Sequence, residues 1–208
     1  MNGQCHHSFC STFFFALLVT GIGFPAWGAT ITWTNTSGGN WSVTNNWSPN
    51  QVPGAADTAL MTTSGTYAIT NNANSQVASL MLGAAAGTQT LTVNGSMLSL
   101  ANGGTVGAHG ILNFSGSTLT GSLTVNGTLN WSNGGSLSGG SALTIASNAV
   151  LNISGIYNES LNGMLTNAGT VNWTGTFPLL APIYLLSLLL NWKRPSGEPK
   201  PAEEQNGS

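Results

Sequence analysis

Short runs in which apolar and polar residues alternate follow one another through residues 89–175. In Leu123–Val125, Leu143–Ile145 and Leu151–Ile153 every second residue is aliphatic and the residue between them is Thr or Asn. Alternation of this kind predicts β-strands with one buried face, and no apolar stripe at helical spacing occurs in residues 30–175. Asn-Gly pairs between the runs predict tight turns. The body of the chain is therefore predicted to be all-β.

The runs recur as units of about 20 residues, which is a period typical of solenoids. One element starts at positions 17, 22 and 20 residues apart: LNFSG at Leu112, LNWSN at Leu129, LNISG at Leu151 and VNWTG at Val171. A second element occurs as LTVNG at Leu123, LTIAS at Leu143 and LTNAG at Leu165. LTVNG also occurs earlier, at Leu91. Each unit thus shows two short strands. The unit length predicts a parallel β-solenoid over residues 77–176, with an antiparallel β-sandwich as the alternative.

Residues 29–76 differ from these repeats and contain three of the seven tryptophans, Trp33, Trp41 and Trp47. The first coil of a solenoid would otherwise expose an unpaired edge and an open apolar end. We therefore expect a tryptophan-rich N-terminal cap followed by the first strands. The alternative is a carbohydrate-binding module in which the three rings stack on sugars.

Charge is nearly absent from the chain: 4% of its 208 residues are charged, and the net charge is −2. The basic residues Lys193, Arg194 and Lys200 all lie in the last 16 positions, and Asp57 and Glu159 are the only acids before them. A nucleic-acid partner is excluded because it would need basic side chains to displace counterions. Stacked coils, by contrast, tolerate the absence of charge, because like charges stacked on one another would repel.

The start of the chain reads as a signal peptide over residues 1–28. An apolar stretch from Phe13 to Phe24 is followed by Pro25 and by the small residues Ala26 and Gly28. Cleavage is expected after Gly28 or one residue later. This pattern predicts export, to the cell surface or the medium.

The other end holds a second apolar run, residues 177–192, directly before Lys193 and Arg194. The basic pair lies where a stop-transfer flank belongs, so a membrane anchor is one interpretation. A buried end-cap of the fold and the end of a truncated gene are the others. Residues 193–208 are rich in Pro and Glu, and this composition predicts a disordered tail.

Few side chains between Thr30 and Gly175 carry acid–base chemistry: Asp57, Tyr67, His109, Tyr157 and Glu159. They contain no carboxylate pair at glycosidase spacing, no nucleophile motif and no metal-binding cluster. The chain is therefore expected not to be an enzyme and to need no cofactor or metal.

Three of these residues, His109, Asp57 and Glu159, are expected to have structural roles. We expect His109 to lie in a solvated turn. We expect Asp57 to cap a turn near Pro53 and Gly54, and Glu159 to lie in a turn that interrupts the repeat.

The order of motifs resembles one class of known proteins. The segment ITWTNTSGGNWSVTNNWSPNQVPGAADTALM, followed by GTYAITNNANSQVASLMLG and GTQTLTVNGSMLSL, resembles the N-terminal part of bacterial secreted β-helix surface proteins, with autotransporter-type or filamentous-haemagglutinin-like passenger regions. The resemblance covers roughly residues 31–175. It implies export, a right-handed parallel β-helix, and a role in adhesion, matrix or surface layers.

These observations predict a structural or adhesive cell-surface module without catalysis. Its partners would be surface glycans, surface proteins or copies of itself. The alternatives are the tryptophan-based carbohydrate-binding module and a truncated fragment of a larger passenger protein.

Overall fold

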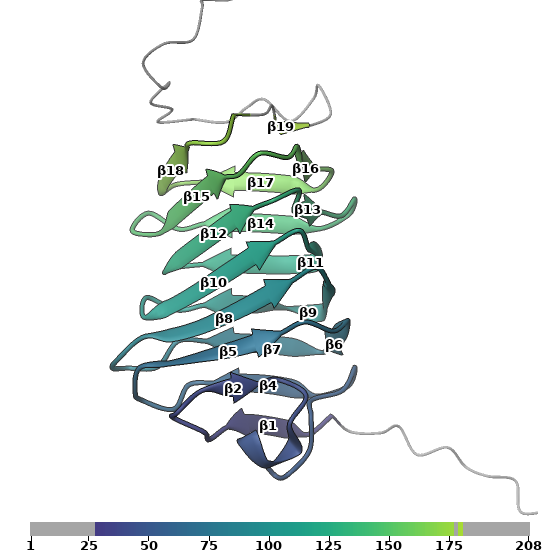
Figure 1. The fold of residues 1–208 in the computed structure, drawn as a ribbon, viewed down its shortest axis with the longest axis vertical. Coiled ribbons are helices and arrows are strands. Elements are labelled where there is room, and N and C mark those ends of the chain that lie inside the picture. The colour runs from purple at the N-terminus through teal and green to yellow at the C-terminus, as the bar shows by residue number, and fades with distance from the viewer. Residues whose placement is uncertain (1–27, 177–178, 181–208) are drawn as a thin grey trace, which may run out of the picture.

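The computed structural model describes residues 28–176 together with Leu179 and Leu180. These residues form a β-solenoid of about six turns, in which each coil stacks in parallel on the previous one (Figure 1). The predicted signal peptide, apart from Gly28, lies outside the described residues. So do residues 193–208 and all but two residues of the apolar run 177–192. Within the described residues, no helix is long and apolar enough to cross a membrane.

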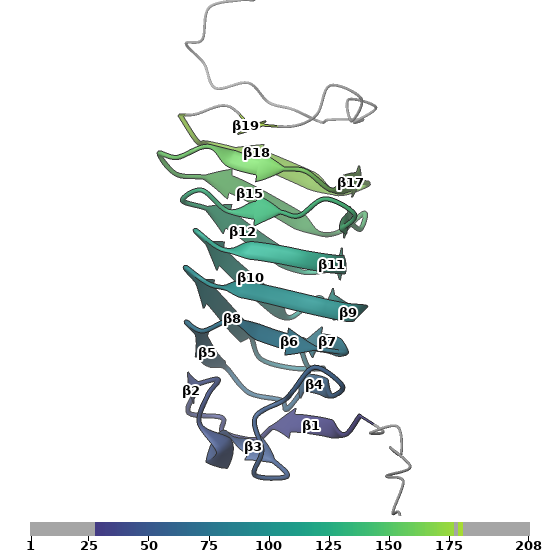
Figure 2. The same ribbon diagram turned by 90° about the vertical axis from the view of Figure 1, so that its right-hand side faces the viewer.

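Each coil has three faces, which Figures 1 and 2 show from two sides. The first face is a sheet of seven strands, all parallel: β2 (Gly39–Asn40), β5 (Tyr67–Asn71), β8 (Gln89–Asn94), β10 (Gly110–Ser115), β12 (Thr128–Ser132), β15 (Val150–Ser154) and β18 (Thr170–Trp173).

The second and third faces share one twelve-stranded sheet, because β9 (Met97–Val106) and β11 (Thr118–Val125) run through both. The second face consists of the first halves of β9 and β11 with β6 (Ser75–Val77), β13 (Ser136–Leu137), β16 (Glu159–Leu161) and β19 (Leu179–Leu180). The third face consists of their second halves with β1 (Thr30–Trp33), β4 (Thr58–Met61), β7 (Ser79–Leu82), β14 (Ala142–Ile145) and β17 (Met164–Asn167).

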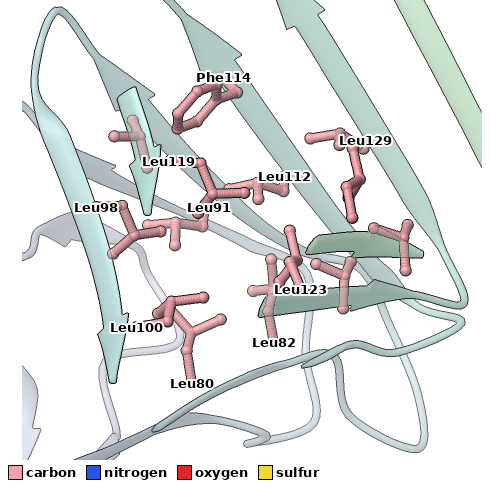
Figure 3. Close-up of a cluster of buried hydrophobic side chains, with 14 of the residues drawn as sticks. Leu80, Leu82, Leu91, Leu98, Leu100, Leu112, Phe114, Leu119, Leu123 and Leu129 are labelled. Atoms are coloured by element: carbon pink, nitrogen blue, oxygen red, sulfur yellow. The ribbon is translucent and has the colours of Figure 1, made fainter. Parts of the chain in front are cut away.

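Aliphatic side chains stack in columns inside the coils, which is why the repeats stay in register. On the first face, β10, β12, β15 and β18 pair in the register that the repeated motif predicts, with buried residues Leu112, Leu129, Leu151 and Val171. Figure 3 shows leucines of all three faces meeting in the interior. A one-residue slip would turn such a column toward solvent, so burial fixes the register.

The two copies of LTVNG occupy different faces. Leu91 lies on the first face, where it pairs with Leu112, whereas Leu123 lies on the third face, where it pairs with Leu143. Both faces require the same alternation of buried and exposed residues, so identical pentapeptides fit either one.

The sequence showed two strands in each unit, and the structure has a third. The strands of the second face place a leucine inward at the equivalent position of four successive coils: Leu98, Leu119, Leu137 and Leu161. With a single buried residue, a strand as short as β13 shows no alternation.

The N-terminal end carries the expected tryptophan-rich cap. Strand β3 (Trp47–Ser48), which follows a short 3-10 helix (Thr44–Asn46), pairs antiparallel with β1 and covers its edge. It is the only antiparallel pair among the described strands. The Trp47 ring makes edge-to-face contacts with Trp33 and Trp41, at centroid distances of 5.0 and 4.8 Å. The rings therefore close the apolar interior at this end.

Candidate binding surface

The two carboxylates of the described residues lie far apart. Asp57 directly precedes β4, Glu159 begins β16, and five strand-to-strand steps separate β4 from β16 in the sheet. At about 4.8 Å per step the separation is about 24 Å. Two carboxyl groups that act on one glycosidic bond lie within about 10 Å of each other. These two cannot form such a pair.

The other ionisable side chains of this part of the chain are one histidine and two tyrosines. His109 lies exposed in the turn between β9 and β10, as expected. Tyr157 is also exposed, and burial raises the pKa of Tyr67. No cluster of three or more His, Cys, Asp or Glu side chains that could hold a metal occurs in residues 28–176.

Asp57 ties the cap to the first coil. One carboxylate oxygen accepts a hydrogen bond from the backbone N–H of Ala29, at 2.8 Å, and the other accepts one from Gly54, also at 2.8 Å. The Gln51 side chain donates a third, at 3.3 Å. The expected turn-capping role of Asp57 at Gly54 is confirmed, and the contact with Ala29 adds an anchor for the first strand.

Glu159 does not lie in a turn, so that expectation was wrong. It is the first residue of β16 and is only 3% exposed. The preceding coil has Gly135 at the equivalent position, and the space that its missing side chain leaves is filled by the Glu159 carboxylate and the Trp131 indole. Gly134 donates its backbone N–H to one carboxylate oxygen at 3.1 Å, while the other oxygen has no hydrogen-bond partner in the described residues.

Burial raises the pKa of Glu159 above its ordinary value of 4.5, and the nearby N–H groups of Gly134, Gly135 and Trp131 offset only part of this effect. No Lys or Arg between residues 28 and 176 can neutralise the charge. The unfolded chain therefore releases this proton at lower pH than the folded chain does. Between the two pKa values the folded state holds more protons, so the free energy of unfolding falls as pH rises.

We therefore expect the thermal midpoint of the full chain to fall as pH rises from about 4.5 toward neutrality. Glu159→Gln should flatten this profile, because the glutamine carries no proton that titrates there. Thermal unfolding followed by circular dichroism across this pH range provides the measurement. Asn94→Ala, which changes an exposed and uncharged side chain, is the control and should keep the wild-type profile. A wild-type slope retained in Glu159→Gln would contradict the assignment.

The three tryptophans proposed for sugar stacking offer no open ring face. Trp33, Trp41 and Trp47 are 0, 3 and 1% exposed, and the indole N–H groups of Trp33 and Trp47 donate to backbone carbonyls within the cap. A sugar could reach these rings only if the cap opened. Their position agrees with the interpretation as cap core and disfavours the stacking platform.

The outward surface of the first face carries a ladder of asparagines. Asn130 donates its side-chain amide to the Asn113 oxygen at 2.8 Å, and Asn152 donates to Asn130 at 2.7 Å. Asn172 continues the ladder at 2.9 Å, and Asn113 donates to the Thr92 hydroxyl at 3.2 Å. Each inner rung thus donates and accepts once. The ladder strengthens the stacking of coils. Because its asparagine side chains already bond to one another, fewer of their polar groups are free to bind a ligand.

Asn130→Ala is expected to lower the free energy of unfolding by about 1–3 kcal/mol, because it removes two hydrogen bonds of about 0.5–1.5 kcal/mol each. Denaturant unfolding of the full chain provides the measurement. Asn94→Ala is the matched control: Asn94 lies on the same sheet, is exposed, and makes no side-chain hydrogen bond within the described residues. Equal losses in the two variants would show that the ladder adds nothing to stability.

The third face has a hollow of about 370 Å³ on its outer surface. It crosses four successive strands, β4, β7, β9 and β11. We call it the third-face groove. Its polar lining comes from Thr58, Ser79, Asn102, Thr105, Ser122 and Thr124.

An irregularity in β9 produces this groove. Between the pairs Leu100–Gly121 and Gly104–Leu123, three residues of β9 face the single residue Ser122 of β11. Gly103, the last of these three residues, has a φ of +90° and carries no side chain. The outward column that contains Ser79 and Ser122 is therefore interrupted at Gly103, and the gap becomes the groove.

Sequence reasoning identified neither the ladder nor the groove. The ladder could have been found, since the four aligned motifs starting at Leu112, Leu129, Leu151 and Val171 all have Asn in second place. The groove gives no such signal, because Asn102-Gly103-Gly104 resembles any other Gly-rich turn of the chain.

No family model, curated protein or solved structure matches this chain.

Proposed function

We propose that this chain is an exported, non-catalytic β-solenoid that acts as a structural or adhesive module at the cell surface. One observation carries the proposal: the outward faces of the coils bear repeated columns of uncharged, hydrogen-bonding side chains. The column Thr105, Thr124, Thr144 and Thr166 on the third face is an example. Many weak hydrogen bonds from such columns suit a repetitive partner, such as a surface glycan, a surface protein or another copy of the chain.

Three further observations support this proposal. The described carboxylates are buried and far apart, so they offer no acid–base pair to a substrate. The pattern of residues 1–28 predicts export, and the motif order of residues 31–175 resembles secreted β-helix surface proteins. An autotransporter-like or haemagglutinin-like passenger is the class that we propose.

Deletion of the gene from the producing cells tests the adhesive role. We expect attachment or matrix formation to be lost, and to return when the full chain is supplied. Protease treatment of intact cells should remove the chain, and N-terminal sequencing should show a mature chain that begins at Ala29 or Thr30. Unchanged attachment together with an intracellular chain would overturn the proposal.

A further inference from the structure

We propose that the third-face groove binds a neutral oligosaccharide that lies along the axis of the solenoid. This inference rests on the proposed adhesive function and assigns it a site and a ligand class. It does not involve the buried tryptophans.

The dimensions of the groove suit a short chain of sugars. The groove spans four strands, and three strand-to-strand steps of about 4.8 Å give a length of about 14 Å. Its volume of about 370 Å³ lies within the range of about 300–1,000 Å³ that small-molecule sites occupy. Because the groove crosses the strands, an elongated ligand would contact several coils at once.

The lining offers hydrogen-bonding groups that the protein does not use. Five hydroxyls and the Asn102 amide line the groove, and none of these six side chains makes a hydrogen bond within the described residues. The asparagines of the first face, in contrast, bond to one another. A ligand with many hydroxyls can satisfy the groove side chains without first breaking hydrogen bonds inside the protein.

The groove also presents an apolar surface. Met81, which is 45% exposed, and Leu60 lie next to each other in one outward column and both line the groove. The thioether is flexible and polarizable, so it can adapt to an irregular apolar partner. Hydroxyls together with apolar C–H faces are the combination that a pyranose ring displays.

The electrostatics of the groove select for a neutral ligand. No charged residue lines it. The nearest in sequence, Asp57, is buried and already accepts hydrogen bonds from Ala29 and Gly54. An acidic glycan would find no cation here, and a basic one would find no free carboxylate.

The experiment uses purified full-length chain on an array of neutral, acidic and basic oligosaccharides, followed by titration calorimetry with the best neutral binder. The double variant Ser122→Ala/Thr124→Ala removes two hydroxyls from the groove. The matched control, Thr70→Ala/Thr170→Ala, removes two exposed hydroxyls from the first face, outside the groove. Circular dichroism and the thermal midpoint establish that both variants are folded.

We expect binding to neutral glycans only, with affinity reduced tenfold or more in Ser122→Ala/Thr124→Ala and unchanged in the control. Equal affinity in both variants, or binding confined to charged glycans, would overturn the groove assignment. If the array binds nothing while gene deletion still abolishes attachment, the groove inference fails and the adhesive function stands. If deletion also leaves attachment intact, both fail.

Discussion

Trp47→Ala is expected to lower the free energy of unfolding by about 3–5 kcal/mol, the usual cost of truncating a large buried aromatic residue. Trp47 is the central ring of the cap, because both Trp33 and Trp41 contact it. Its indole N–H also donates to the Trp41 carbonyl at 2.7 Å. Truncation would leave a cavity and an unpaired buried carbonyl. Denaturant unfolding of the full chain provides the measurement.

The position of Trp47 predicts a second effect. Strand β3, which contains Trp47, covers the edge of β1, and an uncovered parallel edge can pair with another chain. We therefore expect Trp47→Ala to form concentration-dependent oligomers in light scattering. Val43→Ala, in the same cap, is the control, because Val43 is exposed and should tolerate the change. A loss of stability below about 1 kcal/mol in Trp47→Ala would contradict the assignment of Trp47 as cap core.

Asp57→Ala is expected to lower the free energy of unfolding by about 2–3 kcal/mol. Hydrogen bonds to charged groups contribute about 1.5–3 kcal/mol each, and water can replace part of the lost contribution. The change removes the acceptor of Ala29 and Gly54, so β1 and the loop before β4 should loosen together. Hydrogen exchange measured by mass spectrometry should therefore speed up over residues 29–33 and 51–57 and remain slow in β12. Uniform protection throughout the chain would contradict this role.

Asp57→Asn provides an internal comparison. An asparagine can keep one acceptor but turns its amide N–H₂ toward the second backbone donor. Its stability should lie between those of the wild type and Asp57→Ala. A variant as stable as the wild type would show that the negative charge is unimportant.

The repeat pattern predicted much of the fold, because burial on one side of a strand leaves a period of two in the sequence. The aligned motifs at Leu112 and Leu129 pair in the expected register. The pattern does not predict the face of the coil, because LTVNG lies on the first face at Leu91 and on the third face at Leu123. Alternation says that a residue is buried but not on which face, and only the lengths of the intervening turns decide that.

The site was less predictable than the fold for a related reason. Glu159 was expected in a turn because its segment, YNESLNG, interrupts the repeat. Its burial depends on Gly135 in the previous coil, 24 positions earlier in the chain. The third-face groove likewise depends on a mismatch in length between β9 and its neighbours. Neither dependence is visible within one repeat.

The contact between Asp57 and the nitrogen of Ala29 has a consequence for maturation. Cleavage after Gly28, as the leader pattern predicts, would turn that backbone amide into a free α-ammonium group at the same position, 2.8 Å from a carboxylate oxygen. Peptidase processing would then convert a hydrogen bond into an ion pair, and would create the first positive charge in a body that has no Lys or Arg before Lys193. In that case the export machinery would not merely remove a leader. It would also strengthen the contact between Asp57 and Ala29 that holds the first strand to the loop before β4.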